Sequence, residues 1–526
     1  MGTLIGFDFL AQQKLIEDSE KEKANCFEWY SKDTGYGSII GKTRGFDVII
    51  GNPPYIRIQT MKEWAPKEVE YLSSKYQTAA SGNYDIYVVF VEKAIQLLDD
   101  NGLFGFILPH KFFQAEYGKN LRRLITERKL LREIINFTDQ QVFDQVTTYT
   151  NLLFLSKTEK KVFKYAEIRK IENPSSQLSI IRKNNRYVSN TLQVDNLPIS
   201  SISEQSWQFG FGEEAKLLTR LKGVSTKLSD VASTIFVGLQ TSADPIYIVQ
   251  RENMAEEGKH VEVYSKSLDK KLKIESQILK PLLKGQEIRR YSTPYWRYCL
   301  VFPYNIENGK AKLISKEEME AKYPIAWDYL NENKRSLLSR DRGKLKVEWY
   351  AFGRTQNIEQ FYEPKIMTQV LASKASFTLD STGLYYFVGG GNAGGYGIKL
   401  KPEYNLDMRY VTGLLNSKLL DFYLKKVSTR FRGGFFSYAK RFIEQLPILI
   451  PNTNGQKEKE TYEKICLLVD KVLTLNKKLQ DASDSSKKAP LEREAKVYQE
   501  TIDELVYELY GLTDSEKQVV DESLIR

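Results

Sequence analysis

The sequence predicts an α/β protein whose first part holds a mainly parallel sheet. Four short runs are rich in apolar residues, which is typical of strands that are buried on both faces. These runs are residues 46–50, 103–108, 132–137 and 151–156. Helical patterns separate the first three runs, and this alternation favours a parallel sheet that is covered by helices.

Local signals support the helices and turns between these strands. One helical stripe consists of Tyr84, Tyr87, Val91, Ile95 and Leu98. Residues 100–102 (Asp-Asn-Gly) end that helix with turn chemistry, and Pro109 closes the second strand. Residues 117–128 have the pattern of a basic helix.

The chain has 526 residues, which suits two or three domains. We expect a first α/β domain over residues 1–160 and a linker over 161–205, where Ser, Asn and Lys replace the apolar runs. Short mixed strands then predict a mixed α/β domain over 206–450. Residues 451–526 carry two apolar helical stripes around a polar loop at 481–490, which predicts a helical hairpin.

Charge and composition exclude some classes of protein. Lys and Arg number 77 against 67 Asp and Glu, a net charge of +10, which permits nucleic-acid binding but fits a solvated basic surface equally well. No run approaches the ~18 apolar residues of a membrane span, and the start carries no secretory signal. The three cysteines are far apart and only two histidines occur, so we expect a reducing cytoplasm and no metal site.

One motif carries the chemistry. Asn52-Pro53-Pro54-Tyr55 follows the first strand directly, at the carboxyl end where parallel sheets bind ligands. The amino group of adenine is a poor nucleophile, and two acceptors aimed at its hydrogens would free its lone pair. The amide oxygen of Asn52 and the carbonyl of Pro53 are such acceptors, and Tyr55 can stack on a base that has left the duplex. The alternative is a proline-rich turn in which Tyr55 merely packs.

The segments around this motif resemble the catalytic half of the γ-type adenine-N6 DNA methyltransferases, and most of all type IIG restriction–modification enzymes. The resemblance rests on GFDVIIGNPPYIRIQ (45–59), NYDIY (83–87) and ILPHKFF (107–113). VFDQVTTYTNLLFL (142–155) is similar to the motif that brings a second aromatic ring to the flipped base, which implies Phe143; the alternative is a core phenylalanine. The resemblance implies a partial Rossmann-like methyltransferase sheet and a site-specific adenine methyltransferase acting in a restriction–modification system.

Later segments resemble the target-recognition region of the same family, which implies double-stranded DNA as a partner. They are residues 229–249, 278–291, 349–356, 411–423 and 444–449. Each is weak alone, and their order and spacing carry the resemblance. Such regions read base edges and hold phosphates with basic and amide side chains.

Basic and aromatic residues alternate around a Gly pair in RFRGGFFSYAKRF (430–442), which suits phosphate contact and base stacking. The candidates there are Arg430, Arg432, Lys440 and Arg441. Secondary candidates for DNA binding are Arg289, Arg290 and Arg354. The alternative is a solvated charged face over a core turn.

The resemblance implies S-adenosylmethionine as methyl donor, but the segments that should bind it are not found. The family's glycine-rich turn and ribose-binding acid precede the motif, and residues 1–51 carry neither. Residues 34–41 (TGYGSIIG) follow no apolar strand, and residues 388–397 (VGGGNAGGYG) fit a recognition-domain loop better. We expect a donor-binding part to be needed, with a separate chain that also holds a nuclease as one source. Strands near residues 46 and 103 would then have exposed neighbours.

Two other functions stay open. The chain could be a non-catalytic, sequence-specific DNA-binding specificity protein that leaves the chemistry to another chain. The motif could also act on RNA or on a protein glutamine, because an amide nitrogen poses the same chemical problem. The long region after residue 205 favours DNA.

Overall fold

The computed structural model describes residues 45–80, 82–143, 148–252, 258–292, 296–340, 347–389, 391, 393–431, 433–452, 455–482 and 484–525. The chain divides into two compact units, residues 1–211 and residues 212–526. Within the described ranges, no helix is both long and apolar enough to cross a membrane.

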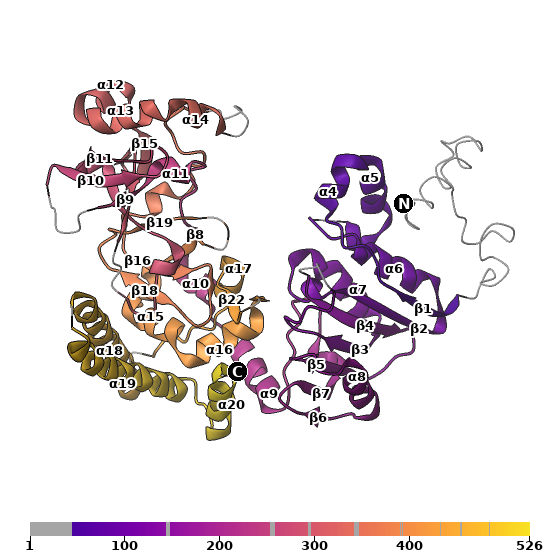
Figure 1. The fold of residues 1–526 in the computed structure, drawn as a ribbon. Helices are drawn as coiled ribbons and strands as arrows, with labels where there is room; N and C mark the ends of the chain where they lie inside the picture. The colour runs from indigo at the N-terminus through magenta and orange to yellow at the C-terminus, as the bar shows by residue number, and fades with distance from the viewer. Residues whose placement is uncertain are drawn as a thin grey trace, which may run out of the picture. The chain divides into compact units, whose positions relative to one another are not determined.

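A seven-stranded sheet forms the first unit, in the order β1-β2-β4-β3-β5-β7-β6 (Figure 1). Its strands are β1 (Phe46–Gly51), β2 (Leu98–Pro109), β3 (Leu131–Asn136), β4 (Thr150–Ser156), β5 (Val162–Ile168), β6 (Tyr187–Val188) and β7 (Leu192–Pro198). The four apolar runs are strands, as predicted, but the expectation of a mainly parallel sheet is wrong. Only the pairs β1–β2 and β3–β5 are parallel. β4 follows β3 after the segment 137–149, whose described residues form no helix, and so runs antiparallel between β2 and β3.

Residues 161–205 are not a linker, contrary to expectation. They form β5, α8 (Pro174–Lys183), β6 and β7, and they extend the sheet by three strands. The polar stretch after residue 172 starts a helix, because the side chain of Asn173 caps the first turn of α8. Polar residues alternate with apolar ones on these strands, so the sequence pattern looks polar although Phe163 and Tyr165 are buried. The first unit therefore reaches residue 211.

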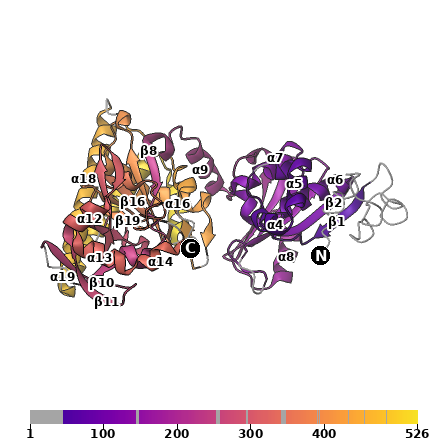
Figure 2. The ribbon, with the colours of Figure 1, turned by 90° about the horizontal axis from the view of Figure 1, so that it is seen from above.

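Helices cover the two faces of this sheet unequally (Figures 1 and 2). The remaining helices of the unit are α4 (Ile58–Trp64), α5 (Pro66–Lys75), α6 (Tyr87–Leu97) and α7 (Lys119–Glu127). α6 and α7 pack in one core with Phe104 and Leu153 of the sheet. The opposite face carries a smaller core, in which Ile181 of α8 joins Ile135 and Ala166.

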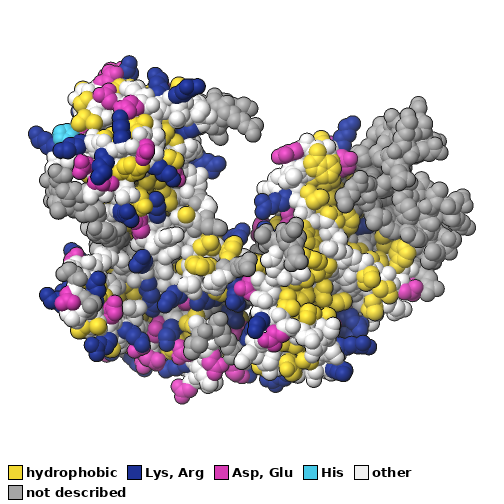
Figure 3. Space-filling view, viewed as in Figure 1, with side chains coloured by type: hydrophobic (Ala, Val, Ile, Leu, Met, Phe, Trp, Pro, Cys, Tyr) yellow, Lys and Arg dark blue, Asp and Glu magenta, His cyan; other side chains and the backbone are white. Residues whose placement is uncertain are grey.

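The sheet has an open edge at β1. Among the described residues, β1 pairs with β2 alone. Val48 and Ile50 are 59% and 78% exposed, and Leu103 on β2 is 41% exposed. Ile50 lies on the same face as Phe154, since a Cβ on Gly105 would meet both. The expected exposure is confirmed for β1, whereas β2 has strands on both sides and only its side chains are exposed. Figure 3 shows hydrophobic side chains gathered on the surface of this unit.

Two larger and two smaller sheets build the second unit. The larger ones have the orders β11-β10-β9-β13-β12-β19 and β18-β16-β20-β8, and the smaller ones are β14-β15 and β17-β22-β21. The strands are β8 (Ala232–Val237), β9 (Ile248–Arg251), β10 (His260–Ser265), β11 (Lys270–Glu275), β12 (Leu279–Leu283), β13 (Tyr298–Val301), β14 (Tyr304–Glu307), β15 (Lys310–Leu313), β16 (Lys365–Gln369), β17 (Leu371–Ala372), β18 (Phe377–Asp380), β19 (Tyr386–Phe387), β20 (Gly395–Leu400), β21 (Arg430–Phe431) and β22 (Phe435–Ser437). The helices are α9 (Glu213–Lys222), α10 (Leu228–Val231), α11 (Asp244–Tyr247), α12 (Lys316–Lys322), α13 (Pro324–Glu332), α14 (Lys334–Leu338), α15 (Met408–Asn416), α16 (Lys418–Val427), α17 (Lys440–Ile443), α18 (Gln456–Asp481), α19 (Ser485–Leu509) and α20 (Asp514–Ile525).

The C-terminal helices share one core with the mixed α/β region. α18 and α19 form the predicted hairpin, but its loop is shorter than expected because α19 runs through Pro490. Ile465 and Val469 of α18 lie against Gly413 of α15, where a Cβ would come within 2.7 Å of Ile465. α20 completes this region and was not foreseen.

In the glycine-rich segment 388–397, Val388 and Gly389 lie directly against the backbone of Gly238 and Leu239. Val388 bridges Leu239, and Gly389 N donates to Leu239 O at 2.6 Å. A Cβ on Gly389 would lie 1.9 Å from Gly238 O. The backbones approach so closely that only glycine fits, which accounts for at least part of this glycine content.

Gly389→Ala should destabilise the second unit by about 1–3 kcal/mol, because the methyl group would overlap backbone that cannot rotate away. Urea unfolding of the whole chain measures this. Gly455→Ala is the matched control, since its Cβ would meet nothing closer than 3.4 Å, and it should change stability by less than about 0.5 kcal/mol. Equal stability of the two variants would contradict the packing described here.

Candidate functional site: the carboxyl edge of the first sheet

The NPPY loop leaves the sheet at the end of β1. Because β1 and β2 are parallel, with Gly51 beside Phe106, the segments that follow both strands emerge at one edge. Asn52 is exposed, and its side chain makes no hydrogen bond with any residue that the structure describes. Pro53 is buried and Pro54 is half-buried. The two prolines thus pack against the rest of the domain, and the Asn52 amide remains free to bind a ligand.

Tyr55 is anchored at both ends of its side chain. Its hydroxyl donates to Ile107 O of β2 at 3.1 Å. Its ring meets Tyr87 edge-on, with centroids 6.4 Å apart at 82°. Partial burial raises the pKa of Tyr55 to about 12, so the hydroxyl stays a donor at neutral pH. The half-buried ring is therefore held in one orientation beside Asn52.

The NYDIY segment (83–87) lies beside the chain that follows the NPPY loop. Ile58 N donates to Tyr84 O, and Ile86 N donates to Ile56 O, both at 2.9 Å, so the chain after the NPPY loop pairs with residues 84–86. The buried hydroxyl of Tyr87 lies 3.0 Å from that of Tyr117, which donates to Asp85 at 3.2 Å. Neither Tyr117 nor Asp85 was predicted as a site residue from the sequence, although Asp85 lies inside the NYDIY segment (83–87).

The ILPHKFF segment adds a turn at the end of β2. His110 follows Pro109 directly, and its ring lies near those of Phe113 and Tyr149, with centroids 6.0 and 5.9 Å away. Its Nδ1 is 3.0 Å from Asn136 Oδ1 at the end of β3. Burial lowers the pKa of His110 below its ordinary value, so the ring is neutral at pH 7.

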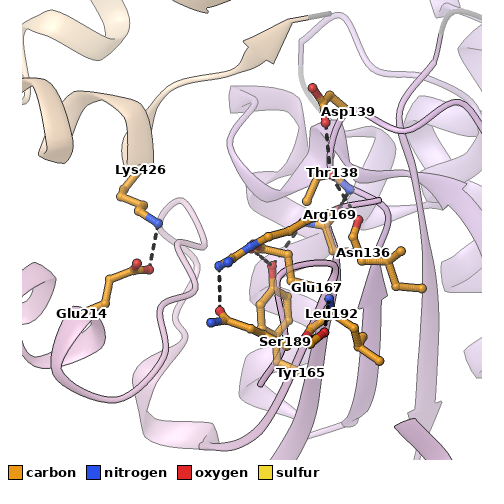
Figure 4. Close-up of polar contacts among 12 residues, drawn as sticks. Asn136, Thr138, Asp139, Tyr165, Glu167, Arg169, Ser189, Leu192, Glu214 and Lys426 are labelled. Atoms are coloured by element: carbon orange, nitrogen blue, oxygen red, sulfur yellow. Dashed lines mark hydrogen bonds and ion pairs between the residues drawn. The ribbon is translucent and has the colours of Figure 1, made fainter. Parts of the chain in front are cut away.

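A chain of polar contacts continues from Asn136 to the edge of β5 (Figure 4). Asn136 Nδ2 donates to Tyr165 OH at 3.2 Å, and Tyr165 donates to Glu167 at 3.5 Å. Arg169 Nε donates to Glu167 at 2.7 Å. Thr138 N donates to Asn136 Oδ1 at 3.1 Å, which fixes the orientation of that amide.

Phe143 is half-buried at the end of a described segment. It is in none of the hydrophobic cores formed by the described residues, whereas its neighbour Val142 packs on the smaller one. The residues after it, 144–147, lie outside the described part of the chain. A role beside the flipped base stays a prediction.

The basic–aromatic segment forms a hairpin and a short helix in the second unit. Arg430 is exposed on β21, with its guanidinium 6.0 Å from the Phe436 ring. Lys440 and Arg441 are exposed on α17. Arg432 lies outside the described residues. Three of the four candidates are thus placed on one short stretch of surface chain.

The secondary basic candidates differ in their surroundings. Arg289 is exposed, and the exposed Arg354 donates to Gln240 at 2.8 Å. Arg290 is half-buried and donates to Gln499 of α19 at 3.0 Å. Arg290 also faces Asp503, whose pKa burial raises to about 6 while this arginine counteracts the rise. The structure therefore gives Arg290 internal partners.

Figure 4 also draws the ion pair of Glu214 with Lys426 (2.9 Å) in this unit.

Segment 388–397 does not fit a donor site. In segment 388–397, a Cβ on Gly389 or Gly395 would meet backbone within 3.0 Å, so those positions have no room for a nucleotide. A strand, β20, follows the segment rather than a helix. Residues 34–41 lie outside the described part of the chain.

Comparison with known proteins identifies the domains. Residues 6–143 match the family of Eco57I restriction-modification methylases, and residues 280–448 match the TaqI-like C-terminal specificity domain. The chain is therefore similar to a methylase in its first part and to a specificity domain in its later part, and the relatives that it matches are type II restriction–modification methyltransferases.

Individual relatives refine this picture. The chain is 28% identical over 497 residues to the type II restriction enzyme and methyltransferase RM.Eco57I of Escherichia coli, covering 90% of this chain and 47% of that protein. It is 21% identical over 496 residues to the methyltransferase M.BstVI of Geobacillus stearothermophilus, covering 91% and 76%. The fold is similar to that of the type IIL restriction-modification enzyme MmeI, solved in complex with DNA, with a TM-score of 0.56, 10% identity, and 93% and 58% coverage. The chain thus spans about half the length of RM.Eco57I.

Arg290→Ala should destabilise the protein in a pH-dependent way. Because the folded pKa of Asp503 is about 6, above its ordinary value of about 3.9, its contribution to stability falls as pH rises through 6. Without Arg290 this pKa rises further, so we expect a loss of about 1–3 kcal/mol near pH 8 and a smaller loss near pH 5. Urea unfolding at both pH values measures it. Arg289→Ala, an exposed neighbour, should leave stability unchanged, and equal losses for Arg290→Ala at both pH values would contradict the assignment.

Proposed function

We propose that this chain is the base-presenting and target-recognition part of a DNA adenine-N6 methyltransferase in a restriction–modification system. One observation carries the proposal: an exposed Asn52 amide stands next to an anchored Tyr55 at the carboxyl edge of a methylase sheet. The matched relatives are named as methyltransferases, which supports methyl transfer as the reaction. The match to a specificity domain supports DNA as the substrate.

The chemistry assigned to the loop is presentation of an amine. Asn52 Oδ1 and the carbonyl of Pro53 accept the two hydrogens of adenine N6, so that the nitrogen lone pair is no longer shared with the ring. Tyr55 stacks on the flipped base and replaces lost stacking, an interaction worth about 1–3 kcal/mol. Phe143 is proposed as the second aromatic contact. Neutral acceptors suffice, because they orient the amine rather than remove its proton beforehand.

The second unit is proposed to read the DNA. Arg430, Arg432, Lys440 and Arg441 would contact phosphates, and Arg289 and Arg354 are further contacts on other segments. Phosphate contacts set the position on the duplex, while the bases specify the site. Arg290 is the weakest of these candidates, since it already has internal partners.

The methyl donor would be S-adenosylmethionine, which supplies an activated methyl group. Since segment 388–397 has no room for it, we assign its site to polypeptide outside the described residues that continues the sheet at β1. The exposed Val48 and Ile50, and the pairing of β1 with β2 alone among the described residues, support this assignment, because a parallel strand is normally covered on both sides. That polypeptide could belong to a separate chain, which could also hold a nuclease. The complete system would act on DNA in the cytoplasm.

Asn52→Ala should reduce methylation by about 100-fold or more, in line with the loss of one preorganised polar group in other active sites. The measurement is N6-methyladenine in DNA from cells that produce the chain in its native gene context. Asn101→Ala is the control: this exposed asparagine lies in the sequence of β2, and the structure gives its side chain no described partner. Undiminished methylation by Asn52→Ala would refute the assigned role.

Calorimetric titration of the purified chain with S-adenosylmethionine, with and without DNA, tests where the donor binds. We expect no micromolar binding by the chain alone. Micromolar binding would contradict a donor site outside the described residues. If the methylation assay also finds no N6-methyladenine while DNA binding is intact, the chain is a specificity protein rather than part of an enzyme.

A further inference from the structure

His110 has a single hydrogen-bonding state that the surrounding network determines. Thr138 N is a backbone donor and lies 3.1 Å from Asn136 Oδ1, so this atom must be the amide oxygen. The same oxygen lies 3.0 Å from His110 Nδ1. An oxygen only accepts, and therefore Nδ1 carries the hydrogen.

The other hydrogen bonds of Asn136 and its neighbours agree with this assignment of the Asn136 amide. Asn136 Nδ2 has an acceptor of its own in Tyr165 OH, and Tyr165 in turn donates to Glu167. Glu167 is held by Arg169, which also donates to Gln193 at 2.7 Å. A flipped Asn136 amide would place its NH2 group against the Thr138 N–H. The orientation is thus set by donors and acceptors on three strands (Figure 4).

The second ring nitrogen, Nε2, is consequently a bare acceptor. The ring is neutral at pH 7, and the charged groups that act on it, Asp139 and Lys111, oppose one another. Nε2 has no hydrogen-bond partner among the residues that the structure describes, and the residue is partly exposed. Phe113 and Tyr149 hold the ring plane in place.

We propose that His110 Nε2 accepts a hydrogen bond from a nucleobase in the catalytic site and so contributes to the choice of methylated base. The inference rests on the proposed function. Phosphate and deoxyribose offer only acceptors, whereas the hydrogen donors of DNA are on the base edges. A protonated histidine would bind a phosphate, whereas this tautomer finds its hydrogen donors on DNA only at the base edges. His110 follows β2 at the same edge of the sheet as the NPPY loop, where the opened base pair would lie.

The tautomer can be measured directly, because the chain has only two histidines. Long-range proton–nitrogen NMR of ¹⁵N-histidine-labelled full chain, assigned with His260→Gln, should show His110 with a protonated Nδ1 and an unprotonated Nε2. His260 is exposed on β10 and serves as the internal reference. A protonated Nε2 at pH 7 would overturn the proposal, whatever the enzyme's activity.

Base reading is tested in the complete methyltransferase on the duplex site that producing cells methylate. His110→Phe keeps an aromatic ring but removes the acceptor, and should lower the ratio of kcat/KM at that site to kcat/KM at single-base variants by about fivefold. His110→Gln, which places an oxygen near Nε2, should restore it, and His260→Phe should have no effect. A ratio unchanged by His110→Phe, or equally reduced by His110→Gln, would overturn the proposal. Absence of methylation by the wild type would instead refute the proposed function.

Discussion

The parallel pairing of β1 with β2 is the constraint on which the site depends. It makes both strands end at one edge, so that Asn52 and His110 leave the sheet at the same edge although 57 residues lie between them. Backbone hydrogen bonds of this pair also carry Ile107 to the position where its carbonyl anchors Tyr55. If the register slipped by one residue, the side chains of β1 would change faces and this geometry would be lost.

The same pairing has a cost on the other side of β1. Ile50 and Val48 remain exposed while the core under α6 and α7 is complete, so among the described residues this edge of the sheet stays uncovered. The strands added by residues 161–205 lie at the far end, beyond β3, and leave this edge untouched. Burying such side chains contributes about 25 cal/mol per Å², which is a substantial reason for further polypeptide to associate here.

In the second unit, close packing decides which basic residues remain for DNA. Arg289 and Arg290 are neighbours, yet one points to solvent and the other is held by Gln499 and faces Asp503. The C-terminal helices cause this difference, because they pack directly on the mixed α/β region. Glycines 238 and 389 serve a related purpose, since they let two backbones touch where a side chain would separate them.

Local patterns predicted the four apolar strands, the NPPY loop after β1 and the helical hairpin, because periodicity, turn residues and motifs need no distant partner. The sequence also indicated that β1 would be exposed. Three features follow only from the tertiary structure. They are the direction of β4, the three strands formed within residues 161–205 and the contact of His110 with Asn136. Strand direction and side-chain hydrogen bonds depend on partners distant in the chain, and the pattern of one segment does not record which partner it will meet.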